Sequence, residues 1–252
     1  MRITLLQTDI KWMSATENIA SAERLLANAE SASLYVLPEM WSTGFVTNAP
    51  GEDQQEALQW MWTKARQLDA AICGSLAVKL DDGRSVNRLF FVEPSGEIAT
   101  YDKRHLFRYG GEDRFYTAGH KRTVVEWRGV RFLLTTCYDL RFPVWMRYQE
   151  DYDAIICVAN WPDSRQHVWH TLLRARAIEN QCYVMGCNRV GDDPNCHYIG
   201  QSAVIDSRGE TMTEDTSGRE GTVTAEIDVA QLRHFREKFQ VLPGRDRFVL
   251  EQ

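Results

Sequence analysis

Cys137 occupies a position at which a chain can expose a nucleophile. It directly follows the strand-like apolar run 130–136 and precedes Tyr138. The last side chain of a buried strand that ends in a sharp turn lies at the sheet edge, where a substrate can reach it. A free thiol has a pKa of about 8.5, so a nucleophilic cysteine requires a base or a positive charge nearby. The position predicts a catalytic cysteine if the chain supplies such partners, and a buried structural thiol if it does not.

Two ionisable residues stand at comparable places. Glu39 follows the short buried stretch 34–37 and Pro38, which has no N–H to donate and therefore ends the strand. A carboxylate flanked by apolar side chains suits a general base, and a surface loop acid is the alternative. Lys103 follows the strand-like run 98–102. It is either a solvated edge residue or the positive charge that a reactive thiol needs.

Composition limits the classes of partner. The chain has 252 residues, is 44% hydrophobic and carries 29 basic against 35 acidic residues, a net charge of −6. This length favours one large α/β domain over residues 1–252. The negative balance excludes an electrostatic footprint for nucleic acid or an anionic membrane, so a small-molecule substrate is expected. The first residues lack a signal-peptide pattern and no apolar run could span a bilayer, so we expect a cytoplasmic protein.

No cofactor is expected from the motifs. The six cysteines contain no C-x-x-C pair, which favours reduced thiols over disulfides or structural zinc. His167 and His170 are spaced as metal ligands can be, but no acidic or cysteine partner accompanies them and a helix-surface role is favoured. No G-x-G-x-x-G or phosphate-binding loop is present, so nucleotide cofactors are set aside.

The order of elements that must position these residues repeats once along the chain. Each half reads as strand, helix, strand, helix, strand and strand, which predicts two mixed sheets packed face to face with helices outside. Active residues would gather at the strand ends where the halves meet. The expected strands are 2–8, 34–37, 71–78, 88–93, 98–102, 130–136, 154–159, 183–190, 202–206 and 210–213, and the expected helices are 17–29, 54–68, 144–150 and 167–180.

Four motifs together carry a family resemblance over nearly the whole length. They are Leu37-Pro38-Glu39-Met40, Tyr101-Asp102-Lys103-Arg104-His105-Leu106-Phe107, Cys137-Tyr138-Asp139-Leu140-Arg141-Phe142-Pro143, and Asn160-Trp161-Pro162 with Ala175-Arg176-Ala177-Ile178-Glu179-Asn180-Gln181. The chain resembles the nitrilase superfamily of carbon–nitrogen hydrolases. The residues of the lysine and cysteine motifs are similar to those of the omega-amidase branch. Enzymes of this branch hydrolyse the terminal amide of 2-oxo acids such as 2-oxoglutaramate.

The resemblance implies an αββα four-layer sandwich and a homodimer joined through helices that follow the cysteine motif. It implies Glu39 as general base, Lys103 as catalytic lysine, Cys137 as nucleophile and Glu112 as a second acid. The oxyanion would be held by Lys103 and the backbone N–H of Tyr138. The enzyme would need no metal or organic cofactor, only its amide substrate and water. The tail, about 230–252, could pack on its own domain or on a partner subunit.

Substrate binding leaves several alternatives open. Aromatic residues that could wall a small pocket, or equally pack in the core, are Trp41, Phe45, Tyr116 and Trp161. Arginines that could bind a substrate carboxylate are Arg108, Arg114, Arg141 and Arg189, of which Arg141 could instead be a structural partner of Asp139. Hydrolysis of an N-carbamoyl amine or another aliphatic amide is the alternative activity. A non-catalytic dimeric interaction module is the alternative of another class.

Overall fold

A computed structural model describes residues 1–46 and 53–250 of the chain. Its first sheet has six strands in the order β13 (Gly221–Glu226), β1 (Arg2–Gln7), β2 (Leu34–Val36), β3 (Ala71–Lys79), β4 (Ser85–Val92) and β5 (Ile98–Asp102). The second has five, in the order β12 (Ala203–Ile205), β9 (Tyr183–Asn188), β8 (Ala154–Ala159), β7 (Val130–Thr136) and β6 (Val124–Trp127). Both sheets are mixed, because parallel pairs at their centres are flanked by antiparallel ones.

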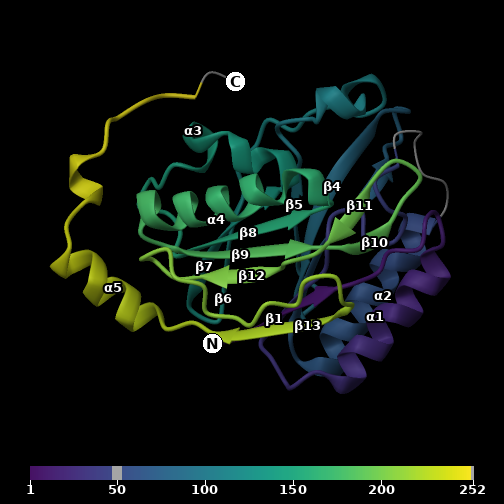
Figure 1. Ribbon diagram of the computed structural model, residues 1–252, viewed down its shortest axis with the longest axis horizontal. Helices are drawn as coiled ribbons and strands as arrows, with labels where there is room; N and C mark the ends of the chain where they lie inside the picture. Colours follow the sequence, from purple (N-terminus) through teal and green to yellow (C-terminus); the bar gives the residue numbers. More distant parts are fainter. Residues whose placement is uncertain (47–52, 251–252) are drawn as a thin grey trace.

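Five helices accompany the sheets. They are α1 (Ala15–Asn28), α2 (Asp53–Leu68), α3 (Pro143–Met146), α4 (Gln166–Asn180) and α5 (Val229–Lys238) within the described ranges. Figure 1 shows α1 and α2 side by side on one flank and α4 over β8 and β9. A two-stranded ribbon of β10 (Val190–Asp192) and β11 (His197–Ile199) projects from the second sheet.

Strand alternation separates three apolar layers. Because successive side chains of a strand point to opposite faces, Leu5 of β1 lies in the cluster between the two sheets, whereas Leu6 packs under α1 and α2. In β7, Phe132 lies between the sheets and Leu133 packs against α4. The layers are therefore helix, sheet, sheet and helix, and the predicted αββα sandwich is confirmed.

Two local predictions are corrected. The expected strand 210–213 is reduced to an isolated bridge between Thr211 and Ile205. The expected helix 144–150 shrinks to α3, because the backbone N–H of Tyr148 is bound by the side chain of Asn180 instead of a helical carbonyl. Strand β13, which the sequence did not indicate, pairs with β1 over six residues.

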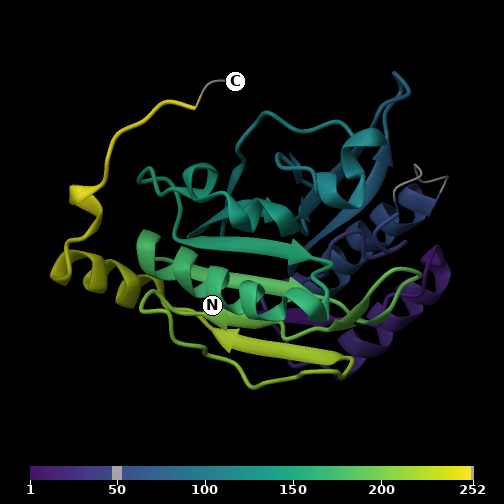
Figure 2. The ribbon, with the colours of Figure 1, turned by 45° about the horizontal axis from the view of Figure 1, so that its top comes forward.

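The segment after α5 runs along one side of the molecule, where Leu242 is buried in the apolar cluster on the outer face of the second sheet. In both ribbon views the yellow chain beyond α5 lies to one side of the sheets (Figures 1 and 2). Helix α5 is also anchored, because Leu232 is buried in the layer between the sheets and Arg236 contacts Asp153. None of the helices in the described ranges has the length and apolar character that a membrane crossing requires.

Asp153 joins β7 to α5 through a fully buried carboxylate. It accepts hydrogen bonds from Arg131 at 3.0 and 2.9 Å and from Arg236 at 3.3 Å. Burial alone would raise the pKa of Asp153, but the hydrogen bonds and charge of Arg131 outweigh it and lower that pKa below its ordinary value of 3.8. The ion pair therefore stabilises the fold above about pH 4 and loses that contribution as acid protonates the carboxylate.

Replacing this carboxylate should destabilise the protein in a pH-dependent way. Asp153→Asn leaves two arginines without their shared anion, and we expect a loss of about 2–3 kcal/mol in the free energy of unfolding at pH 7. The loss should shrink as the pH falls below about 4. Urea unfolding at both pH values measures it. Asp69→Asn, which removes the exposed partner of Arg128, is the matched control and should cost less than about 1 kcal/mol. Equal losses in the two variants would contradict this account.

Candidate active site

A buried lysine lies between two buried carboxylates at the edge of the first sheet. Lys103 Nζ is 2.8 Å from Glu39 Oε1 and 2.9 Å from Glu112 Oε2, and none of the three side chains has any exposed surface. Glu39 follows β2 and Lys103 follows β5, as the sequence predicted. Glu112 begins a short 3-10 turn, Glu112–Arg114, in the loop after β5. The expected acid–lysine–acid grouping is present.

The charges of Lys103 and of the two carboxylates stabilise one another. Burial would lower the pKa of Lys103, but the carboxylates of Glu112 and Glu39 outweigh burial and hold that pKa well above its ordinary value. The lysine therefore keeps its charge. Burial raises the pKa of Glu112, which Lys103 only partly offsets. The cluster therefore holds a buried ammonium in a fixed position, where its charge can act on a bound substrate.

Glu39 is oriented from both sheets. Asn87 Nδ2 of β4 donates to its Oε1 at 2.7 Å, and the backbone N–H of Asn160, after β8, donates to its Oε2 at 2.9 Å. Asn160 Nδ2 also donates to the Glu39 carbonyl at 2.7 Å. Sequence reasoning gave no role to either asparagine. The available signal was the position of Asn160, which directly follows the apolar run 154–159.

Cys137 lies at the end of β7, in a strained turn. Its φ of +46° places a non-glycine residue in the left-handed region, a conformation that costs about 1–3 kcal/mol and persists only where surrounding contacts enforce it. The thiol is half-buried, and its Sγ is 4.0 Å from the Asn160 carbonyl. Burial and the Glu39 charge raise the thiol pKa well above its ordinary value, against the opposing charge of Lys103. The thiol therefore holds its proton at neutral pH, and its ionisation is linked to Glu39.

The carboxylate of Asp139 enforces that turn. Its Oδ2 accepts from the backbone N–H of Thr136 at 2.9 Å and from Tyr101 Oη at 2.7 Å. Its Oδ1 accepts from the backbone N–H of His105 at 3.0 Å. One fully buried carboxylate thus joins the cysteine turn of the second sheet to the segment around Lys103 in the first. Asp139 is engaged here rather than with Arg141, so the alternative structural role of Arg141 is corrected.

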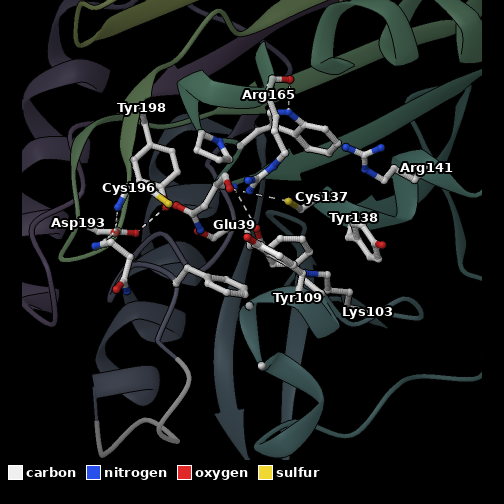
Figure 3. Close-up of a pocket in the computed structure, with 18 of the residues that line it drawn as sticks. Glu39, Lys103, Tyr109, Cys137, Tyr138, Arg141, Arg165, Asp193, Cys196 and Tyr198 are labelled. Atoms are coloured by element: carbon white, nitrogen blue, oxygen red, sulfur yellow. Dashed lines mark hydrogen bonds and ion pairs between the residues drawn. The ribbon is translucent and has the colours of Figure 1, made fainter. Parts of the chain in front are cut away.

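The cysteine, Glu39 and Lys103 open onto one cavity of about 550 Å³ (Figure 3). This volume is within the range of small-molecule sites, about 300–1,000 Å³. Figure 3 shows Asp193, Cys196 and Tyr198 across the cavity from Tyr138 and Arg141. The lining residues that sequence reasoning had named are Glu39, Phe45, Lys103, Arg114, Cys137, Tyr138, Arg141 and Trp161.

Some expected binding residues lie elsewhere. Tyr116 is buried beside Met40, with its hydroxyl on the Val46 carbonyl, and does not line the cavity. Trp41 packs against Trp60 under α2, because large aromatic side chains fill a core as readily as a pocket. Both expectations of a pocket wall are corrected.

Two of the four candidate arginines also lie away from the cavity. Arg189 is fully buried and donates to the carbonyls of Val190, Ile10 and Asp192, and Arg108 is exposed beside Asp113. Sequence reasoning missed Arg165, Asp193 and Tyr198, which do line it. Their side chains reach the cavity only in the folded chain, and no local pattern in the sequence indicates this position. Across the described ranges, no three His, Cys, Asp or Glu side chains gather as metal ligands would.

Comparisons with known proteins agree on the family. Residues 2–237 match the model of the carbon–nitrogen hydrolase family. The chain is 47% identical over 253 residues to the omega-amidase YafV of Escherichia coli (strain K12), covering 99% of this chain and 98% of that protein. It is 36% identical to the 2-oxoglutaramate amidase of Bacillus subtilis (strain 168), covering 95% of each.

A solved structure gives the same answer. The crystal structure of XC1258 from Xanthomonas campestris, a CN-hydrolase superfamily protein with an arsenic adduct in its active site, has a TM-score of 0.92 and 39% identity, and the match covers 100% of this chain and 99% of that one. A non-catalytic interaction module is therefore set aside. The chain belongs to the carbon–nitrogen hydrolase family of the nitrilase superfamily and is an amidase.

Proposed function

We propose that this amidase is an omega-amidase, which releases ammonia from the terminal amide of a small 2-oxo acid such as 2-oxoglutaramate or 2-oxosuccinamate. The observation that carries the proposal is the buried Lys103 ammonium, fixed between two carboxylates on the cavity that Cys137 enters. The similarity to proteins named omega-amidase and 2-oxoglutaramate amidase supports the choice of substrate.

The first half of the reaction forms a thioester. Because the thiol is protonated at rest, attack requires a base, and Glu39 takes that proton as Cys137 Sγ adds to the amide carbon. The charge that develops on the carbonyl oxygen is stabilised by the Lys103 ammonium and the backbone N–H of Tyr138. Glu39 then gives its proton to the amide nitrogen, and the C–N bond breaks to release ammonia.

The second half removes the acyl group. Glu39 takes a proton from water as that water adds to the thioester carbon, and Lys103 again stabilises the oxyanion. The C–S bond breaks, the proton returns to the Cys137 thiolate, and the dicarboxylic product leaves. Glu112 holds Lys103 in position and transfers no proton.

The cavity favours an anionic substrate. Among the described residues that line it, the only carboxylate besides Glu39 is Asp193, whereas Arg114, Arg141 and Arg165 supply positive charge. Asp193 already accepts from the backbone N–H of Asn195 at 2.7 Å and of Cys196 at 2.8 Å. Phe45 and Trp161 form apolar walls for the short carbon chain. This balance favours an acid amide over the neutral aliphatic amides of the alternative activity.

We also propose that two copies of the chain pair in a homodimer. Apolar side chains are exposed at Val144 of α3 and Ile178 of α4, the helices that follow the cysteine turn. Phe239 and Val249 of the segment after α5 are exposed as well. Exposed apolar side chains on these neighbouring elements are what a shared interface would cover.

The proposal predicts selective, cysteine-dependent ammonia release. The protein should hydrolyse 2-oxoglutaramate in preference to glutamine and an N-carbamoyl amine, and Cys137→Ala should reduce that turnover to background, because no thioester can form. Ammonia release from the three substrates measures this. Cys157→Ala, which removes a buried thiol outside the cavity, is the matched control for folding. Substantial turnover by Cys137→Ala would exclude a thioester mechanism, and release only from another amide would favour the alternative activity.

Lys103→Ala should lower the turnover number at least about 100-fold, the usual cost of removing one donor to an oxyanion. The variant also leaves Glu39 and Glu112 without their cation, so its melting temperature has to be measured alongside. Lys121→Ala removes an exposed lysine from the same loop and serves as control. A folded Lys103→Ala protein with near-normal turnover would refute the role of Lys103.

The two carboxylates should differ in importance. Glu39→Gln removes the proton carrier and should lower turnover more than Glu112→Gln, which removes charge but keeps a polar side chain beside Lys103. Single-turnover measurements of ammonia release compare them directly. The reverse order would exchange their roles.

A further inference from the structure

Three arginines line the cavity, and only one of them is half-buried. Arg114 and Arg141 are exposed, whereas Arg165 is partly covered. Within residues 1–46 and 53–250, no carboxylate lies within ion-pair distance of Arg165 and its guanidinium donates no hydrogen bond. Its guanidinium lies over the ring of Phe107, with 5.2 Å between the guanidinium carbon and the ring centre. A partly desolvated charge without a partner gains more from an incoming anion than an exposed charge does.

Backbone hydrogen bonds hold Arg165 close to Glu39 and Cys137. Trp161 Nε1 donates to the Arg165 carbonyl at 2.8 Å, and the Arg165 N–H donates to the Pro162 carbonyl at 3.0 Å. This tight turn begins next to Asn160, whose backbone N–H binds Glu39. The main chain of Arg165 is therefore held close to the reacting centre by a short, hydrogen-bonded segment, and its guanidinium lies against the Phe107 ring. Figure 3 shows Arg165 beside the cavity that contains Cys137 and Glu39.

We propose that Arg165 binds the carboxylate of the substrate and so determines specificity for acid amides; this inference rests on the proposed function. A guanidinium presents paired N–H donors that match the two oxygens of a carboxylate. Bound in this way, one end of the substrate is held at Arg165 while its amide lies at Cys137, so the site selects substrates by the length of the carbon chain between the carboxylate and the amide.

The other cations of the cavity are less suited to this role. Lys103 is already engaged by Glu39 and Glu112. The Arg141 guanidinium lies 5.4 Å from the Trp161 ring centre and 6.0 Å from that of Tyr138, and its exposure means that water competes for it. Arg141 can attract an anion to the entrance, but its hold on that anion is weaker than that of Arg165.

The test measures how the protein distinguishes an acid amide from a neutral one. Arg165→Met keeps an extended side chain against Phe107 but removes the charge. The ratio of kcat/KM for 2-oxoglutaramate to that for pentanamide should fall about 10- to 100-fold, the value of hydrogen bonds to a charged group. The loss should fall mainly on KM, and Arg165→Lys should recover part of the ratio. Arg108→Met, an exposed neighbour outside the cavity, should leave the ratio unchanged, and Arg141→Met should lower it less.

A binding measurement separates failure of this inference from failure of the proposed function. Cys137→Ala cannot turn over, so its affinity for the product 2-oxoglutarate can be measured by calorimetry with and without Arg165→Met. A 10- to 100-fold loss of affinity supports the inference even if 2-oxoglutaramate proves not to be hydrolysed, which would overturn the substrate alone. Equal losses on acid and neutral amides, no change in either, or a larger effect at Arg141 would overturn the role of Arg165. Absence of 2-oxoglutarate binding to Cys137→Ala would overturn both.

Discussion

The site depends on one buried cation. Moving an ammonium group from water into the protein interior costs several kcal/mol, and Lys103 is stable there only because Glu39 and Glu112 compensate for the lost water. Each carboxylate in turn needs its own donors. Asn87 donates to both carboxylates, and the backbone of Asn160 donates to Glu39. The neighbouring strand ends are thereby fixed relative to the charge, and a reactive site is assembled from groups that would be costly to bury singly.

A third buried carboxylate, that of Asp139, positions the cysteine turn near Lys103. Asp139 accepts hydrogen bonds from the cysteine turn and from the segment around Lys103, which belong to different sheets. The same contacts hold the left-handed backbone of Cys137. Strain at the nucleophile is therefore balanced by hydrogen bonds between the two halves of the chain, and the geometry of attack is set before a substrate arrives.

The features that could be predicted from the sequence are those that local residue patterns determine. Cys137, Lys103 and Glu39 stand at strand ends that apolar runs and Pro38 mark, so their meeting where the two halves of the chain face each other followed from topology. Positions that depend on packing could not be predicted. Trp41 and Tyr116 are aromatic residues of the kind that lines a pocket, but they pack in the core. Arg165 lines the cavity because of a turn after Pro162, which no periodicity in the sequence indicates. Strand β13, whose partner β1 lies more than two hundred residues away in the chain, was missed.

That last pairing affects how the protein can be made. β1 lies between β2 and β13, with Gln7 opposite Gly221 and Arg2 opposite Glu226. At a synthesis rate of about 5–20 residues per second, β1 leaves the ribosome on the order of 10–40 s before β13 exists. Throughout that time, one edge of an apolar strand presents unpaired N–H and C=O groups to any neighbouring nascent chain. The first sheet is completed only when the second half has been synthesised, so a fragment that ends before Gly221 has an open edge and is prone to aggregate.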